Sequence, residues 1–353
     1  MHAERSGQTH LRLSVLDQSP IAQGSTGARA LANTIELARL TDRLGYHRYW
    51  VAEHHGGPML AGPSPEALIG PIASLTERIR VGSGGVMLPH YSPFKVAETF
   101  SVLAGLFPGR IDLGIGRAAG TDPITSRVLQ RDRRGAPPDD FPEQLAELLA
   151  FLEGTFPEDS PVARLVALPG LPEVPEPWLL GSSLQSAVWA AQLGLRYAFA
   201  DFITPGGGDI ARHYRDEFAH TGRLGEPVVA VAASVICADS DEEARRLAAS
   251  GQMAFSMLRR GRLIAIPPVA EALAWLGERG ERPGAPAGRR AILGSPETVR
   301  AGIEALAAEY GAGEVIVVTI THEHAARRRS YELIAGAFGL TAPQAAVAQA
   351  SLG

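Results

Sequence analysis

The sequence is poor in features that would mark several classes of protein. Its 353 residues contain a single cysteine, Cys237, so no disulfide can form within the chain. Lys95 is the only lysine and the formal net charge is −5, which gives no basic footprint for nucleic acid. No apolar run reaches the roughly 18 residues of a membrane-spanning helix. Residues 1–10 lack the apolar core of a signal peptide, so we expect a cytoplasmic protein without membrane attachment.

What the sequence does contain is an ordinary globular composition, 45% apolar and 20% charged. Strand-like runs alternate strictly with helical segments from one end of the chain to the other. This alternation predicts a single (β/α)8 TIM barrel over residues 1–353, with a doubly wound sheet as the alternative. Loop insertions are expected at about residues 118–140, 154–177 and 259–290. The expected strands are residues 11–16, 47–52, 79–89, 110–116, 178–181, 196–201, 227–238 and 313–320.

The polar triplet Glu53-His54-His55 follows the second expected strand, at the edge where parallel α/β folds bind ligands. Adjacent histidines could bind a metal, act as acid and base, or be structural. Neighbouring strand residues face opposite sides, and neither a His-Glu-x-x-His spacing nor a cysteine pair is present, so no metal is expected. A single histidine facing a cleft, with a pKa of roughly 6.5, is the favoured interpretation.

Glycines interrupt two of the expected strands. Glycine weakens a strand interior, so Gly84-Gly85 indicates a special feature there. Candidates are a bulge, an unusual peptide bond or the close approach of a planar ligand. Residues 114–119 match a relaxed G-x-G-x-x-A dinucleotide pattern, but no helix is expected to begin at Asp122-Pro123, which disfavours that site. These glycines are more consistent with something flat lying against the backbone.

Residues 181–184, Gly-Ser-Ser-Leu, lie at a strand-to-helix corner that could hold an anion at a helix N-terminus. The alternative is a plain serine N-cap, and the spacing of a nucleophile elbow is absent. Arg117 follows the fourth strand and could reach the same anion with two hydrogen bonds, unless it is a solvated loop residue.

Four motifs together resemble the bacterial luciferase-like flavin monooxygenases. They are residues 49–55, 79–89, 109–117 and 181–194, and their order and spacing match the family across residues 11–340. Residues 13–20 and 88–93 are similar to a subgroup associated with natural-product oxidation.

The resemblance implies a barrel that binds FMN at the carboxyl ends of its strands. Arg117 and Ser182 match the phosphate ligands of the family, and Ser183 and Leu184 would add hydroxyl or backbone contacts. The Gly84-Gly85 pair matches a non-proline cis peptide that lies against the flavin ring, and Gly116 would lie beneath that ring.

The resemblance also makes His54 the catalytic residue, a base or stabiliser beside the reactive edge of the flavin. Glu53 and His55 flank it, and His55 in relatives helps at the subunit contact. The chain departs from the pattern at Gly181, where luciferase carries a glutamate next to the phosphate serine, and in its own long polar loop after Arg117.

The implied activity is that of a monooxygenase that uses reduced FMN and O2 to oxidise a small organic substrate. A separate NAD(P)H:flavin reductase would supply FMNH2, and a homodimer through helices near strands two and three is expected. The alternatives are an F420-dependent oxidoreductase on the same barrel, a non-catalytic flavin-binding protein and, more distantly, a metal-dependent hydrolase. Residues 259–290 are positioned to cover the site after the seventh strand.

Overall fold

The computed structural model describes residues 11–118, 122–129, 140–170 and 173–341. The remaining parts of the expected insertions, residues 119–121, 130–139 and 171–172, lie outside the described residues, as do residues 1–10 and 342–353.

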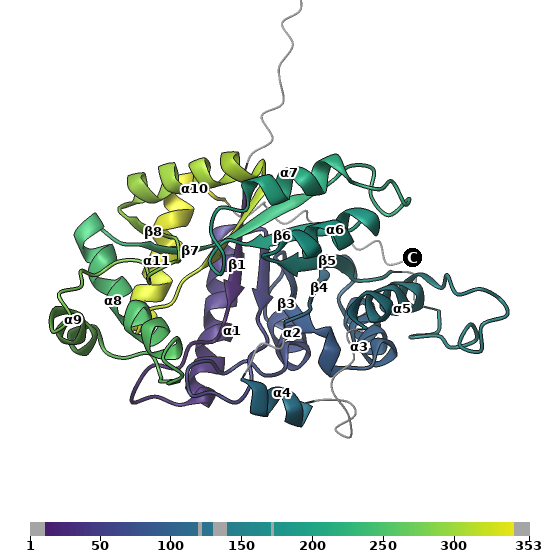
Figure 1. Ribbon diagram of the computed structural model, residues 1–353, viewed down its shortest axis with the longest axis horizontal. Helices are drawn as coiled ribbons and strands as arrows, with labels where there is room; N and C mark the ends of the chain where they lie inside the picture. The colour runs from purple at the N-terminus through teal and green to yellow at the C-terminus, as the bar shows by residue number, and fades with distance from the viewer. Residues whose placement is uncertain (1–10, 119–121, 130–139, 171–172, 342–353) are drawn as a thin grey trace, which may run out of the picture.

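The strands form one parallel sheet that closes on itself (Figure 1). β1 pairs with β2 on one side and β9 on the other, β9 pairs with β7, and β7 pairs with β6. The (β/α)8 barrel expected from the alternation is therefore confirmed. The strands are β1 (Arg12–Asp17), β2 (Arg48–Val51), β3 (Arg80–Met87), β4 (Ile111–Gly116), β5 (Glu176–Gly181), β6 (Arg196–Ala200), β7 (Val229–Cys237), β8 (Ala291–Gly294) and β9 (Glu314–Val318).

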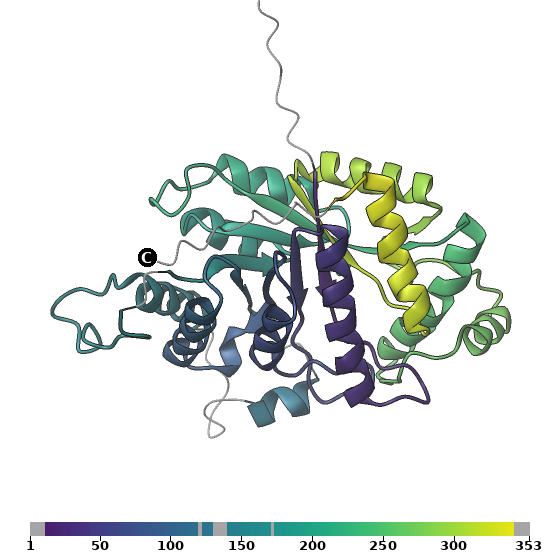
Figure 2. The same ribbon diagram turned by 180° about the vertical axis from the view of Figure 1, so that it is seen from behind.

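Helices surround the barrel. In Figure 1, α8 and α9 lie at the end opposite α3 and α5, and Figure 2 shows α1 beside α11. No helix in the described ranges is both long and apolar enough to cross a membrane. The helices are α1 (Gly27–Leu44), α2 (Pro65–Ser74), α3 (Pro93–Leu106), α4 (Pro123–Leu129), α5 (Phe141–Glu153), α6 (Leu184–Gln192), α7 (Gly208–Asp216), α8 (Asp241–Leu258), α9 (Val269–Gly277), α10 (Pro296–Tyr310) and α11 (His324–Phe338).

Two details of the chain differ from expectation. β8 is a ninth strand, which pairs with the end of β7 outside the closed barrel. It was missed because only four residues pair, directly after a long Pro/Gly-rich stretch. A helix, α4, begins at Pro123 where none was expected, because Asp122 accepts hydrogen bonds from the backbone N–H groups of Ile124 and Thr125.

The barrel interior is filled from its amino end. Arg48 lies there 3% exposed, donates to Asp112 and Glu314 at 2.7 and 2.6 Å, and sits over the Trp178 ring at 4.7 Å. Above it, the rings of Trp50 and Trp178 meet edge to face with centroids 5.4 Å apart. Among the described residues, this floor fills the amino half of the interior, and the expected site residues lie in the carboxyl half.

Candidate active site

The expected site residues follow or lie within the carboxyl ends of consecutive barrel strands. His54 comes after β2, Gly84 and Gly85 lie in β3, Arg117 follows β4, and Ser182 follows β5. Because neighbouring parallel strands end at the same edge, residues far apart in the sequence converge on one mouth. The registers Met87↔Gly116 and Gly181↔Phe199 hold these ends level.

One cavity of about 290 Å³ brings most of these residues together. Leu16, Trp50, Ala198, Ala232 and Ile316 also line it and supply an apolar inner wall. The alanines of β6 and β7 matter because larger side chains at those positions would project into this space. Leu184 does not line the cavity, and its side chain is 51% exposed. The expected residues that do line it are Gly84, Gly85, Gly116, Arg117, Ser182 and Ser183.

One end of this cavity carries hydrogen-bond donors suited to an anion. The Arg117 guanidinium lies over the Trp189 ring at 5.2 Å, and no residue in the described ranges accepts a hydrogen bond from it. Ser182 Oγ is 3.3 Å from Thr204 Oγ1, and Ser183 caps α6 by accepting from the Ser186 N–H at 3.4 Å. A cation, a hydroxyl and a helix N-terminus thus belong to the lining of the same cavity, a set of groups that fits a phosphate.

The glycines of β3 present bare backbone to the cavity. The Gly84-Gly85 peptide bond is cis, and the register of β3 against β4 shifts between Ser83 and Val86. A Cβ at Gly84 would lie 3.0 Å from Trp50 Cβ, and one at Gly85 would lie 2.8 Å from the Gly114 carbonyl oxygen, and neither neighbour can easily move. The packing of the barrel itself therefore requires glycine here, and the flat wall is a consequence of that packing.

His54 lines a second cavity, of about 240 Å³, that adjoins the first. Its backbone N–H donates to the Gly62 carbonyl at 2.9 Å, and its Nε2 lies 3.5 Å from Gln18 Nε2. The two cavities have part of their wall in common. The shared residues are Leu16, Gly84, Met87, Phe202 and Ile203.

Glu53 lies behind the histidines and is fully buried. Its carboxylate accepts from the Met87 N–H at 2.9 Å and from the Tyr91 hydroxyl at 3.0 Å, and it lies 2.7 Å from His55 Nε2. Burial, and secondly the charge of Glu53, raise the pKa of Tyr91, so this phenol stays a hydrogen-bond donor. Glu53 therefore fixes His55 and the end of β3, and it does not line either cavity.

The departure at Gly181 has a physical reason. A Cβ at this position would overlap Oγ and Cβ of Ser186. Ser186 in turn reaches Tyr197 Oη at 2.9 Å and the Ser183 carbonyl at 2.6 Å. The space that a side chain at position 181 needs is thus filled by the first turn of α6.

Several wall residues carried no expected role. Gln18 follows β1 as His54 follows β2, so its position at a strand end was a usable signal. Trp189 lies on α6 and stacks under Arg117, which no local pattern indicates. Arg289 comes from the irregular segment before β8 and lines the cavity of His54. Within the described parts of the chain, no group of His, Cys, Asp or Glu is arranged to hold a metal.

A family model for luciferase-like monooxygenases matches residues 11–313. The chain belongs to the luciferase-like monooxygenase family. This chain is 41% identical to a luciferase-like monooxygenase of Escherichia coli K12, over 92% of this chain and 96% of that protein. It is 37% identical to the N-acetyl-S-alkylcysteine monooxygenase of Bacillus subtilis, over 93% and 98%. The crystal structure of apo-MsnO8 matches with a TM-score of 0.86 at 41% identity, over 94% and 99%.

More distant members of the same fold differ in cofactor. The oxygenating constituent of a Pseudomonas putida 3,6-diketocamphane monooxygenase, in complex with FMN, matches with a TM-score of 0.68 at 21% identity, over 92% of this chain and 97% of that one. An F420-dependent secondary alcohol dehydrogenase matches with a TM-score of 0.63 at 13% identity, over 93% and 99%. At these identities the likeness concerns the barrel alone, and the resemblance to the family rests on the closer relatives.

Proposed function

We propose that this luciferase-like monooxygenase uses reduced FMN and O2 to oxidise a small organic substrate. The observation that carries the proposal is the shared wall between two cavities, one with phosphate donors at its end and one containing His54. One oxygen atom would enter the substrate and the other would leave as water, with two electrons from reduced FMN. Supplying those electrons and activating O2 is the chemistry of the cofactor, and the chain positions and shields it.

In this proposal Arg117, Ser182 and the start of α6 bind the phosphate of FMN. Ser183 holds that helix end in place, and Leu184 contributes only its backbone N–H. The apolar cavity admits the ring against the backbone of Gly84, Gly85 and Gly116. Such a wall excludes water, which strengthens every polar interaction inside it.

His54 is the proposed catalytic residue. Its imidazole lies in the cavity next to the ring site, where it can accept or donate one proton as the substrate is oxidised. Gln18 contacts its Nε2, and the backbone hydrogen bond to Gly62 fixes its main chain. His55, hydrogen-bonded to Glu53, lines the same cavity as His54.

Two alternatives use the same cavities. An F420-dependent oxidoreductase would place a deazaflavin at the phosphate donors and would not consume O2. A flavin-binding protein without catalysis would keep the donors and make His54 dispensable. The curated relatives at 41% and 37% identity are named monooxygenases, which favours the oxygen-consuming proposal.

Two partners complete the proposal. A separate NAD(P)H:flavin reductase supplies FMNH2. A second copy of the chain covers α2 and α3, where Leu75, directly after α2, is 51% exposed and Val102 and Leu106 of α3 are 45% and 66% exposed.

The decisive experiment measures cofactor binding and oxygen uptake separately. FMN and F420 are titrated against the purified protein, and O2 consumption is followed with NADH, FMN, a flavin reductase and an N-acetyl-S-alkylcysteine as first probe substrate. Catalase distinguishes coupled oxidation from peroxide release. We expect FMN to bind and O2 uptake to yield an oxygenated product. The variant His54→Ala should bind FMN and form no product. Tight F420 binding with no O2 uptake would replace the proposal by its first alternative.

A further inference from the structure

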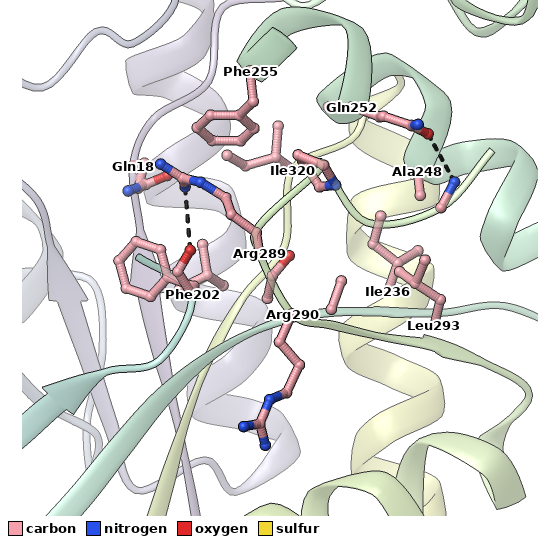
Figure 3. A pocket seen from close by; sticks show the side chains of 16 residues that line it. Gln18, Phe202, Ile236, Ala248, Gln252, Phe255, Arg289, Arg290, Leu293 and Ile320 are labelled. Carbon is pink, nitrogen blue, oxygen red and sulfur yellow. Dashed lines mark hydrogen bonds between the residues drawn. The ribbon is translucent and has the colours of Figure 1, made fainter. Parts of the chain in front are cut away.

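Two adjacent arginines before β8 have opposite surroundings. Arg290 forms ion pairs with Glu309 at 2.5 Å and Asp201 at 3.5 Å, and hydrogen bonding to Glu309 raises its pKa. Arg289 forms no ion pair with any described residue. Figure 3 shows the two side chains pointing apart, with Arg289 directed toward Gln18 and Phe255.

Arg289 is held in place without being neutralised. Its Nη1 donates to the Phe202 carbonyl at 3.2 Å, and its guanidinium lies over the Phe255 ring at 4.5 Å. Burial, and secondly the charge of Arg259, lower the pKa of Arg289, as expected for a partly buried cation with no acidic partner. The guanidinium edge formed by Nε and Nη2 makes no hydrogen bond to a described residue. That edge matches the two oxygens of a carboxylate.

Arg289 faces the space in which the substrate would be oxidised. It lines the 240 Å³ cavity together with His54, and a smaller adjoining cavity of about 40 Å³ together with Gln18. Neither cavity has an aspartate or glutamate among its described lining residues. Arg289 is absent from the lining of the cavity that carries Arg117 and Ser182, so it is separate from the phosphate donors.

We infer that Arg289 is a specificity-determining residue that binds a carboxylate group of the substrate beside His54. The inference rests on the proposed function only in treating the occupant of the His54 cavity as the substrate. A carboxylate at the Nε–Nη2 edge would complete the hydrogen bonding of Arg289, and the Phe255 ring would shield the pair from water.

The test compares acids with their uncharged amides. N-acetyl-S-butylcysteine and its primary amide form one pair, and hexanoate and hexanamide form a second pair without sulfur. Each is titrated by calorimetry against flavin-free and FMN-loaded protein. The variants are Arg289→Gln, Arg289→Lys and the control Arg260→Gln, since Arg260 is an exposed arginine over the Trp275 ring outside both cavity walls.

We expect at least one acid to bind the wild type about tenfold or more tightly than its amide, as a hydrogen bond to a charged group provides. Arg289→Gln should abolish this preference without changing amide binding, Arg289→Lys should retain part of it, and Arg260→Gln should match the wild type. Equal binding of acid and amide in both pairs, or binding of no acid, overturns the inference.

FMN binding and O2 uptake of the same preparations separate the two proposals. Normal FMN binding with no preference for acids leaves the monooxygenase proposal intact and removes the role of Arg289. An acid preference that depends on Arg289 in a protein that binds no flavin retains the carboxylate site and removes the monooxygenase proposal.

Discussion

The side chains of Gln18 and His54 meet across the ends of β1 and β2, with the two Nε2 atoms 3.5 Å apart. The strands are level here, because Asp17 lies opposite Val51 in the ladder. An amide nitrogen can only donate, so the contact is a hydrogen bond when the imidazole nitrogen accepts. Gln18 therefore places an uncharged side chain beside the His54 imidazole.

Replacing Gln18 by glutamate should move the pH dependence of activity. A carboxylate at this distance stabilises the protonated imidazole, so a base at His54 would become available only at higher pH. We expect the acidic limb of the kcat/KM profile to shift upward by about one unit in Gln18→Glu relative to the neutral control Gln18→Met. Superimposable profiles of the two variants would remove His54 as the titrating base.

The Arg117→Gln variant should distinguish phosphate binding from ring binding. Arg117 lies over Trp189 in the cavity proposed to hold FMN, so its loss should weaken FMN binding by about tenfold to a hundredfold. Riboflavin, which has no phosphate, should bind both proteins alike. Fluorescence titrations with the two flavins measure this, and a matched control is Arg212→Gln, an exposed arginine on α7. Equal losses for FMN and riboflavin would place the phosphate elsewhere.

Position 181 should tolerate no side chain while Ser186 is present. Gly181→Ala forces a Cβ against Ser186, and such overpacking typically costs about 1–3 kcal/mol of unfolding free energy. Ser186→Gly removes the obstructing atoms, so the double variant should be more stable than the sum of the two single effects predicts. Urea denaturation of the four proteins completes the cycle. Strict additivity would show that the collision is relieved by other movements.

The buried pair of Asp17 and Arg327 should make stability depend on pH in the acid range. Burial alone would raise the pKa of Asp17, but Arg327, 2.5 Å away, and hydrogen bonds from Tyr49 and Ser19 lower it overall. The unfolded chain therefore binds this proton more readily than the native state. The stabilisation is complete above the unfolded pKa of about 3.9 and is lost as the pH falls through the lower native value.

The variant Asp17→Asn leaves the buried Arg327 without its partner, which should cost about 3–5 kcal/mol at pH 7. The difference from the wild type should stay constant above pH ~5 and shrink below pH ~4. Asp209→Asn, at an exposed pair with Arg212, should change stability little. Urea titrations at several pH values measure the difference, and a difference that grows on acidification would contradict this account.

The sequence predicted the barrel well because its strands carry local signals. The expected strand over residues 110–116 was observed as Ile111–Gly116, and the expected strand over residues 196–201 was observed as Arg196–Ala200. β8 was not predicted because it has only four residues, and the pairing with β7 that stabilises it cannot be recognised from the local sequence. α4 was not predicted, although Asp122 caps it. None of its residues is buried, so its sequence lacks the helical spacing of apolar residues that predicts a helix.

The same difference applies to the site residues: those directly after strands could be predicted from the sequence, and those on long connections could not. His54, Arg117 and Ser182 follow strands, so the topology alone places them at one mouth. Arg289 could not be placed from the sequence, because a long irregular connection returns it to the barrel through contacts with Phe202 and Phe255. Leu184 failed to reach the cavity because the first turn of α6 directs its side chain toward solvent.

The tryptophan layer above Arg48 determines on which side of the barrel the two cavities lie. Trp50, Trp178 and Arg48 are all buried and block the axis of the barrel at its amino end. Among the described residues this layer closes the amino end of the barrel, and both adjoining cavities lie on its carboxyl side. Because Gly84 and Met87 belong to the walls of both cavities, a substitution at either residue would change the shape of both cavities at once.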